Sequence, residues 1–369
     1  MKVLIVGNGH LTKTGVQYSL HREIASFVSD CVSFGMNVSY ASCVTESVTL
    51  NLSNSLFPDH VHVEEIPSLS HLPLHKKLLS FPSFVYFFIL LIRRYDFFYC
   101  FYPGNVSSLV VLLAILFRKK YGLYVRGELF PSKFTQFILK HASFILAVGS
   151  SIVSKICPDY QNCRDVVPMS NVFQSDTSTF LKDSFRSPLR GVFVGRVSKE
   201  KGCFDLLLAM KILRDKSIPV VMNFVGTYMP DFEEEVKSMH LEDCVTLSGL
   251  AKGADELRRH YEAADFFCLP TWTEGFPRVL YEAMSHGLPC ITTMVGGIPS
   301  RMHAGENCLA INVRDPKSIC DAIMTFVRYP EKMKMLSLAS IKTFQYWKLF
   351  FEGQTHAKQL LKEINQLNS

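Results

Sequence analysis

The alternation of short apolar runs with longer helix-periodic stretches constrains this chain more than any other feature of its sequence. The short runs, such as KVLIV, DFFYCF and GVFVG, are apolar almost throughout. Continuous apolar strands are typical of parallel sheets that helices cover on both faces, and strands that alternate with helices indicate βαβ units. The sequence therefore predicts an α/β fold of doubly wound parallel sheets.

The length of the chain indicates two such sheets. Its 369 residues exceed the size at which one hydrophobic core keeps growing, and the polar, aperiodic segment 174–188 interrupts the alternation. We therefore expect two Rossmann-like domains, residues 1–175 and 189–345, that face each other across a cleft. The last helix, within 346–369, follows the natural end of the second domain, and we expect it to pack back on the first.

The individual elements follow from the same pattern. In the first domain we expect strands in KVLIV, MNVSYA, VHVEEI, DFFYCF, LYVRG and FILAV, and helices over 16–29, 74–94, 106–120, 132–141 and 150–157. In the second we expect strands in GVFVG, PVVMNFVG, CVTLSG, DFFCLP, LPCITT and CLAINV, helices over 203–214, 231–240, 254–263 and 278–286, and further helices after CLAINV. The last helix of the chain is expected over 347–366. Ligands of such sheets bind beyond the carboxyl ends of the strands, so the loops there carry the candidate sites.

Charge and cysteine content exclude several function classes. The net charge of +6 is spread over both halves, +4 up to residue 185 and +2 after it. This lacks the concentrated basic stripe of a nucleic-acid-binding protein, and we expect no nucleic-acid partner. The eleven cysteines form no CxxC pair and no Cys/His cluster at metal-ligand spacing, so neither a zinc site nor a redox motif is indicated.

The segment LPTWTEGFPRVLYEAM predicts a strand, a loop and a helix that begins near Pro277 or Arg278. A helix start offers unpaired N–H groups and a positive dipole end, which suit a pyrophosphate. Glu282 lies one turn inside and points back toward that end. Its carboxylate can accept two hydrogen bonds from a vicinal diol such as a ribose, and Glu274 in the loop could do the same for sugar hydroxyls. For Arg278, phosphate contact, sugar selection and plain solvation stay open.

A second segment, VFVGRVSKEKGCFDLLLAM, predicts a strand, a basic loop and a helix. Arg196 and Lys201 lie between Gly195 and Gly202 at the carboxyl end of the domain's first strand. Charged donors at that place would stabilise the negative charge that develops on a nucleoside-diphosphate leaving group. The loop alone fits a solvated surface loop equally well; its combination with the first segment favours a binding site.

Together these segments resemble the GRxxxxKG and EGFxxxxxE signatures of the retaining glycosyltransferases of family 4, whose fold is the two-domain GT-B arrangement. AVGSSIVSKI and GGIPSRMHAGENCLAI are similar to further segments of that family. The sequence departs from the pattern at Cys308, where the family usually has glycine, and at Ser300, where an acidic residue is frequent. The resemblance covers the C-terminal domain closely and the N-terminal domain in layout.

The resemblance implies a hexosyltransferase that moves a sugar from a UDP- or GDP-sugar to a hydroxyl of a saccharide or lipid-linked acceptor, with retention of configuration. Cell-surface polysaccharide or lipopolysaccharide synthesis is the expected setting. Arg196 and Lys201 would bind the phosphates and act in catalysis with Glu274, while Glu282 would bind the ribose and backbone around 246–250 the base. The implied donor-binding set is Gly15, Gly195, Arg196, Lys201, Leu250, Glu274, Gly275, Phe276, Pro277, Val279 and Glu282.

The acceptor is expected on the N-terminal domain. His10 follows the first strand, Arg126 lies at the end of the strand LYVRG and Glu128 follows it, at the edge where an acceptor would bind. The alternative is that Arg126 and Glu128 form a structural ion pair. No Asp-x-Asp occurs in the chain, so we expect no divalent metal and no other cofactor beside the phosphates.

Other readings stay open. The same fold hosts sugar phosphorylases and nucleotide-sugar epimerases, and an inactive sugar-nucleotide-binding partner of an assembly complex is a third alternative. Apolar stretches near 74–94 and 106–120 carry basic residues at their ends, as in Arg93–Arg94, 118–120 and 75–77. They predict a cytoplasmic protein that docks reversibly on the anionic inner face of the cell membrane. The alternative is that both are ordinary sheet-covering helices.

Overall fold

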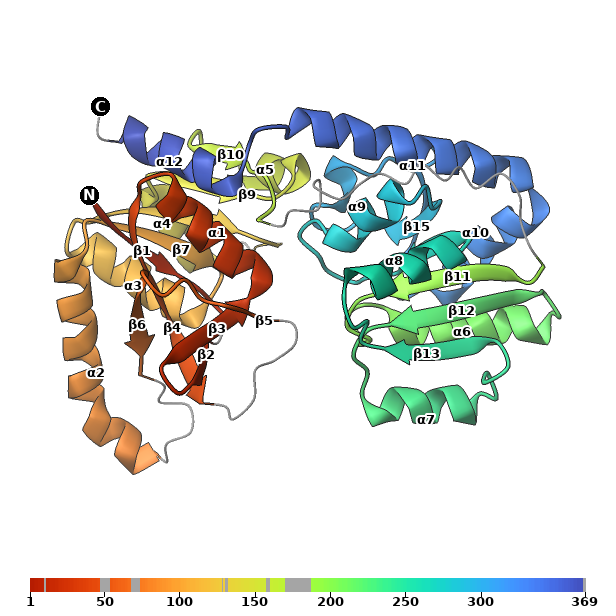
Figure 1. The fold of residues 1–369 in the computed structure, drawn as a ribbon, viewed down its shortest axis with the longest axis horizontal. Coiled ribbons are helices and arrows are strands. Elements are labelled where there is room, and N and C mark those ends of the chain that lie inside the picture. Colours follow the sequence, from red (N-terminus) through yellow and green to blue (C-terminus); the bar gives the residue numbers. More distant parts are fainter. Residues whose placement is uncertain are drawn as a thin grey trace. The chain divides into compact units, whose positions relative to one another are not determined.

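The computed structural model describes residues 1–9, 11–46, 54–67, 74–127, 129, 132–156, 160–169 and 187–367, with the backbone alone for 54 and 74–81. The chain divides into two compact units: unit 1 comprises Met1–Asn171 and Gly353–Ser369, and unit 2 comprises Val172–Glu352. Each unit contains a largely parallel sheet with helices (Figure 1). The predicted fold class, two Rossmann-like α/β domains, is confirmed. His10, Glu128 and most of the predicted linker 174–188 lie outside the described residues.

Unit 2 has a six-stranded, wholly parallel sheet in the order β13-β12-β11-β14-β15-β16. Its strands are β11 (Leu189–Val194), β12 (Val220–Val225), β13 (Val245–Gly249), β14 (Phe266–Leu269), β15 (Cys290–Thr293) and β16 (Cys308–Ile311). Its helices are α6 (Cys203–Asp215), α7 (Pro230–Ser238), α8 (Ala254–Ala263), α9 (Arg278–Ser285), α10 (Pro316–Arg328) and α11 (Pro330–Phe350). The strands and helices expected from periodicity lie here within a few residues of their predicted positions.

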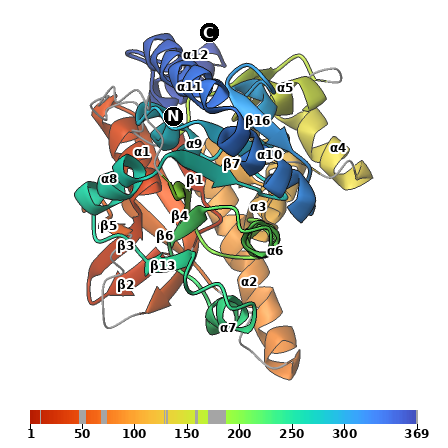
Figure 2. The ribbon, with the colours of Figure 1, turned by 90° about the vertical axis from the view of Figure 1, so that its right-hand side faces the viewer.

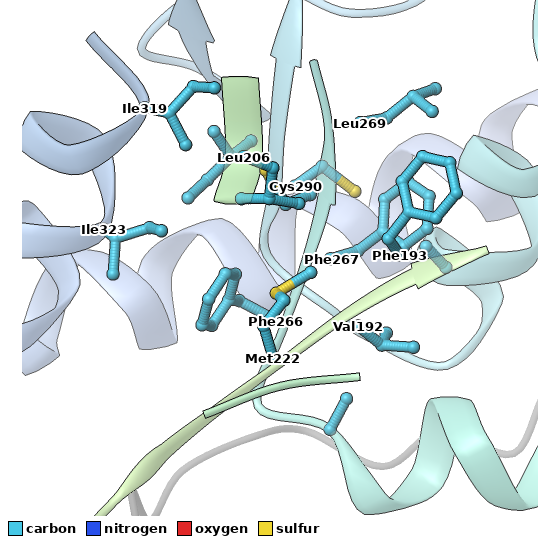
Figure 3. Close-up of a cluster of buried hydrophobic side chains, with 14 of the residues drawn as sticks. Val192, Phe193, Leu206, Met222, Phe266, Phe267, Leu269, Cys290, Ile319 and Ile323 are labelled. Carbon is cyan, nitrogen blue, oxygen red and sulfur yellow. The ribbon is translucent and has the colours of Figure 1, made fainter. Parts of the chain in front are cut away.

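Helices on both faces bury the central strands of this sheet. In β14, Phe266 packs against Phe326 of α10, and its neighbour Phe267 packs against Tyr261 of α8. Successive side chains of a strand point to opposite faces, so a strand covered on both sides must be apolar throughout. Figure 3 shows β14 among the buried side chains of β11, β12, α6 and α10.

Unit 1 has a ten-stranded sheet in the order β10-β9-β8-β7-β1-β4-β2-β3-β5, with β6 paired to β4. Its strands are β1 (Lys2–Val6), β2 (Leu11–Thr14), β3 (Gln17–His21), β4 (Asn37–Glu46), β5 (Asn54–Leu56), β6 (His62–Ile66), β7 (Phe97–Tyr102), β8 (Lys120–Val125), β9 (Phe144–Ala147) and β10 (Cys163–Asp165). Its helices are α1 (Arg22–Ser33), α2 (Leu74–Arg94), α3 (Asn105–Leu116), α4 (Lys133–His141), α5 (Ser150–Ile156) and α12 (His356–Gln366). α2 and α3 lie side by side (Figures 1 and 2).

The start of unit 1 differs from the sequence prediction. The helix expected over 16–29 is wrong at its beginning: α1 starts at Arg22, and residues 11–21 form an antiparallel hairpin of β2 and β3. Gly15 adopts φ +62° at the turn, a conformation that glycine adopts without strain. The strands of this hairpin have four and five residues, too few to show the two-residue period that distinguishes a strand from a helix.

Two helix ends also differ. The helix expected over 106–120 ends at Leu116, because Arg118 adopts φ +54° and Lys120 already begins β8. The single helix expected over 347–366 is two helices, since α11 ends at Phe350 and α12 begins at His356. Gly353 at φ +69° allows the break, and the Thr355 hydroxyl caps the new helix by accepting from the Lys358 N–H.

α12 belongs to unit 1, where it contacts α1. Its first residue, His356, is 2% exposed. The Tyr99 hydroxyl donates to His356 Nε2 at 2.7 Å, and His356 Nδ1 donates to the Val167 carbonyl at 3.0 Å. The ring also packs edge-on against Phe27 and Tyr124. This arrangement needs a neutral imidazole, and burial lowers the pKa of His356 to about 3.

We therefore predict that His356→Ala destabilises unit 1 strongly. It leaves a buried hydroxyl and a buried carbonyl without partners, at about 1–3 kcal/mol each. The melting temperature should fall by roughly 10 °C in calorimetry, whereas Lys362→Ala, at an exposed position of the same helix, should change it little.

The difference between wild type and His356→Ala should depend on pH. The pKa of the folded state lies below the unfolded value of 6.5, so the unfolded chain binds the proton first. The stability that His356 contributes is complete above about pH 6.5 and declines by about 1.4 kcal/mol per pH unit below it. A difference that stays constant between pH 7 and pH 5 would contradict a neutral buried imidazole.

Candidate functional site

The order of strands in unit 2 places a candidate site between β11 and β14. These strands are neighbours, but the chain continues from β11 to β12 and β13 on one side and from β14 to β15 and β16 on the other. The loops that follow β11 and β14 therefore diverge at the carboxyl edge of the sheet. In open α/β sheets such a switch point is where ligands bind. The two loops, 195–202 and 270–277, contain the two sequence motifs.

The two loops touch through backbone. Gly202 adopts φ +68°, and a Cβ atom at this position would lie 2.0 Å from the Pro270 carbonyl oxygen. Beside it, a Cβ at Gly226, after β12, would lie 1.9 Å from the Gly195 carbonyl oxygen. Both distances are far shorter than any van der Waals contact, so only glycine permits this approach. Gly202, the second glycine of the GRxxxxKG pattern, thus has a steric role.

Trp272 joins the loops by two hydrogen bonds. Its backbone N–H donates to the Glu200 carbonyl at 2.8 Å, and its indole N–H donates to Asp205 Oδ2 at 2.7 Å. The Arg314 guanidinium stacks on the indole, 4.2 Å from the ring centroid. Sequence reasoning missed Trp272 and Asp205 as partners, although Trp272 lies within the quoted motif.

Lys201 and Glu274 meet across the two loops. The Lys201 ammonium forms an ion pair with Glu274 Oε1, and the two side chains are 22% and 20% exposed. Arg196, at the start of the first loop, is exposed. The structure therefore brings together two of the three predicted catalytic residues in one contact, on a rim that also carries Arg196.

The helix after the second loop begins as predicted. α9 starts at Arg278, and the preceding Pro277 provides no side-chain cap for its first amides. Glu282 is 18% exposed and is held at both carboxylate oxygens: Arg278 Nε lies 2.9 Å from Oε1, and the Tyr261 hydroxyl donates to Oε2 at 2.8 Å. The ion pair with Glu282 is a contact of Arg278 that the sequence analysis did not predict.

A third loop, after β15, supports the loop of Glu274. The Gly297 N–H donates to the Gly275 carbonyl at 2.7 Å. Gly296 adopts φ +56°, and a Cβ there would lie 1.6 Å from the Glu274 carbonyl oxygen. The Thr293 hydroxyl donates to the Thr271 carbonyl at 2.7 Å. Ser300 and Cys308, where the sequence departs from the family pattern, are both buried.

The remaining predicted residues lie in different places. Phe276 and Val279 pack against the core of unit 2, and Leu250, after β13, is 50% exposed. Gly15 lies in the hairpin turn of unit 1, with no atom within 4 Å of an added Cβ. Arg126, also in unit 1, lies 4.0 Å from Glu23 of α1, so an ion-pair partner for it exists within the described chain.

Comparison with known proteins bears on this site directly. Residues 189–328, which include both motifs, match the family model described as "Glycosyl transferases group 1". This part of unit 2 is therefore similar to the glycosyltransferases of group 1. The predicted resemblance to glycosyltransferases is thereby confirmed for residues 189–328, where the motifs indicated it.

Curated relatives also align with only part of this chain. The spore coat protein SA of Bacillus subtilis is 34% identical over 154 residues, which cover 39% of this chain and 41% of that protein. The amylovoran biosynthesis glycosyltransferase AmsK of Erwinia amylovora is 35% identical over 129 residues, which cover 32% and 31%. The chain thus matches less than half the length of these relatives.

Solved structures match the whole chain at low identity. HepE of Anabaena, in complex with UDP and glucose, has a TM-score of 0.66 at 14% identity and covers 100% of this chain and 99% of its own. The sucrose-phosphate synthase of Thermosynechococcus elongatus has a TM-score of 0.69 at 19% identity, with coverage of 99% and 98%. These likenesses agree with the two-unit fold.

Neither a metal cluster nor a membrane span emerges from the described residues. Among them, no three or more His, Cys, Asp or Glu side chains are grouped so that they could hold a metal ion. None of the helices within the described ranges combines the length and the hydropathy that crossing a bilayer requires.

The third loop gives a prediction. Gly296→Ala should displace the loop of Glu274, because the new methyl group meets the Glu274 carbonyl in addition to the strain of a positive φ. Gly305→Ala is the matched control: its φ is +81° and nothing lies within 4 Å of its Cβ. We expect Gly305→Ala to cost about 1 kcal/mol and Gly296→Ala clearly more, measured by denaturant unfolding. Equal costs would show that the close approach is absent.

Proposed function

We propose that this chain is a retaining hexosyltransferase that moves a sugar from a UDP- or GDP-sugar to a hydroxyl of a saccharide or lipid-linked acceptor. The observation that carries the proposal is the convergence of Arg196, Lys201, Glu274 and the start of α9 at the switch point of unit 2. Basic side chains and the positive end of a helix suit a diphosphate. Cell-surface polysaccharide synthesis, at the cytoplasmic side, is the setting we propose.

Each group has a task in this reaction. The bond from the anomeric carbon to the phosphate oxygen breaks, a bond to the acceptor oxygen forms, and the acceptor proton leaves with the nucleoside diphosphate. Lys201, Arg196 and the first amides of α9 would stabilise the charge that develops on the leaving phosphate. These positive groups supply the neutralisation that a divalent ion supplies elsewhere, so we propose that no metal is required. Retention rests on the family resemblance.

The acceptor and base sites belong to the same proposal. Leu250 and the backbone around 246–250 would hold the base, and Glu274 with Gly275 and Phe276 the transferred sugar. In unit 1, Arg126 remains our candidate for the acceptor side, and His10 and Glu128 stay candidates from the sequence.

The Lys201–Glu274 ion pair must open when the donor binds. A phosphate would replace the Glu274 carboxylate as the partner of Lys201, which frees Glu274 for sugar hydroxyls. The exchange keeps Lys201 paired in both states. It also makes Glu274 a competitor of the phosphate whenever no sugar is bound.

The test of the function is transfer from a panel of UDP- and GDP-sugars to saccharide acceptors in buffer that contains EDTA, with the product's anomeric configuration read by NMR. Lys201→Ala should lower kcat/KM by roughly 10- to 100-fold, since a charge-assisted hydrogen bond contributes about 1.5–3 kcal/mol. Arg196→Ala should act in the same direction. Lys199→Ala removes a charge from the same loop, and its ammonium lies over Phe204; it should leave turnover unchanged. An inverted product, or turnover restored only by Mg²⁺ or Mn²⁺, would refute retention or metal independence.

Glu274→Gln should separate binding of the diphosphate from transfer. We expect UDP to bind about five-fold more tightly, because a partly exposed ion pair that it must break is worth about 1 kcal/mol, while transfer falls at least ten-fold. Isothermal titration with UDP or GDP measures the first effect and product formation the second. Weaker nucleotide binding in Glu274→Gln would argue against the exchange of partners.

We also propose that unit 1 docks on an anionic lipid surface. The exposed apolar side chains of α2, α3 and α4, here called the α2–α4 patch, are Tyr86, Leu90, Leu112, Leu116, Phe134 and Phe137. The three helices contact one another in sequence, α2 with α3 and α3 with α4. Arg93, Arg118, Lys133 and Lys140 are exposed at the ends of these helices or beside them. Residues 75–77 of the predicted basic start lie where only the backbone is described.

Vesicle co-sedimentation tests this surface. With phosphatidylglycerol vesicles at low salt the protein should sediment, and added salt should release it, because the attraction between exposed charges is screened. Leu116→Glu combined with Phe134→Glu should abolish binding. Leu208→Glu, at a 43% exposed position of α6 in unit 2, is the matched control. Wild-type protein that stays in the supernatant would make a soluble acceptor the better hypothesis.

A further inference from the structure

The carboxylate of Glu282 is fixed by a residue that neither motif contains. Tyr261, on α8, donates its hydroxyl to Glu282 Oε2 at 2.8 Å. Arg278, one turn before Glu282 on α9, lies 2.9 Å from the other oxygen. Each carboxylate oxygen has two lone pairs, so these two contacts leave acceptor positions on both oxygens.

The phenol of Tyr261 is well placed to remain a donor. Its side chain is 1% exposed and packs against Phe267. Burial, together with the negative charge of Glu282, raises the pKa of Tyr261 far above its ordinary value. The hydroxyl therefore stays protonated, and the ring is locked by the core, so the O–H is held in one direction.

His286 contacts both the ring of Tyr261 and the backbone of Glu282. Its ring stacks on Tyr261, with centroids 5.1 Å apart and planes 20° apart. Its Nδ1 lies 2.8 Å from the Glu282 backbone carbonyl, which also accepts from the Ser285 hydroxyl at 2.7 Å. The backbone and the carboxylate of Glu282 are thus fixed by the same group of side chains.

Without the phenol, the carboxylate would lose its orientation. An arginine guanidinium presents parallel donors and tends to take both oxygens of a carboxylate. Arg278 is 43% exposed and can follow Glu282. A symmetrical fork between them would turn the carboxylate toward the guanidinium and change the direction of the lone pairs left for a diol. The Tyr261 hydroxyl opposes this by holding Oε2.

We propose that Tyr261 is a positioning residue, which orients the Glu282 carboxylate to accept both hydroxyls of the ribose diol of the nucleotide donor. This rests on the proposed function, since it needs a ribonucleotide at this place. Tyr261 itself touches no substrate in this proposal. It acts through the direction in which Glu282 presents its remaining lone pairs.

The experiment is a double-mutant cycle in which one change is made in the protein, at Tyr261, and the other in the ligand, at the 2′-hydroxyl. Dissociation constants of UDP, GDP and their 2′-deoxy analogues are measured by isothermal titration for wild type and Tyr261→Phe, which deletes one oxygen and keeps the ring. We expect Tyr261→Phe to weaken the ribonucleotide about ten-fold and the 2′-deoxy analogue less than two-fold. In turnover, KM for the donor should rise about ten-fold while kcat changes less than two-fold.

Two further variants separate positioning from general stability. Tyr121→Phe removes another buried phenol, in unit 1, whose hydroxyl donates to the Ile138 carbonyl at 2.5 Å; it should bind nucleotides as wild type does. Arg278→Gln, at an exposed position, should keep the preference for the ribonucleotide, because Tyr261 remains. If Tyr261→Phe fails to fold, this preference in Arg278→Gln still tests the proposal, and its loss would assign the positioning to Arg278.

The outcomes distinguish this inference from the proposed function. If wild type binds none of the four nucleotides, the proposed function fails and the inference with it. If wild type binds them but Tyr261→Phe weakens UDP and 2′-deoxy-UDP equally, or neither, the proposed function stands and Tyr261 has only a structural role.

Discussion

Backbone contact among three loops of unit 2 is the constraint on which its site depends. Gly202 lies against the Pro270 carbonyl, and Gly296 lies against the Glu274 carbonyl, at distances that leave no room for a side chain. Backbone that packs this closely moves little relative to its neighbours, and preorganised charges act most strongly when they need no rearrangement. The three loops therefore hold the backbone of Lys201 and of Glu274 in place. The ion pair between the two side chains is the one of these contacts that a ligand would have to break.

How well each element of this fold could be predicted depends on whether its own local sequence determines it. Buried parallel strands such as β14 must be apolar on both faces, so local sequence identifies them. The hairpin of β2 and β3 has strands of four and five residues, too short for their period to be recognised. The break after Phe350 depends on Gly353 and the Thr355 cap, which lie inside an otherwise continuous helical pattern. Local rules failed where a few residues overrode a longer pattern.

The residues of the candidate site also fall into two groups, those that the sequence identifies and those that only the tertiary fold reveals. Arg196, Lys201, Glu274 and Glu282 could be identified because they occupy strand–loop–helix positions where chemistry and spacing agree. Tyr261 and Asp205 could not, because their partners, Glu282 and Trp272, lie far from them in sequence and only the tertiary fold brings them together. Gly15, expected beside the donor, lies in the turn of the hairpin of unit 1. Groups that orient a functional side chain are, in this protein, contributed by elements outside its motif.

The position of α12 has a consequence for how the chain is made. Unit 1 includes Gly353–Ser369, which the ribosome produces only after the whole of Val172–Glu352. At about 5–20 residues per second, this interval lasts roughly ten to forty seconds. During this interval, the face of the sheet that carries Tyr99 and Tyr124 is not yet covered by α12, which begins at His356. The second unit can therefore be complete before the first, and the nascent chain presents an aromatic surface that chaperones could recognise until α12 has been made.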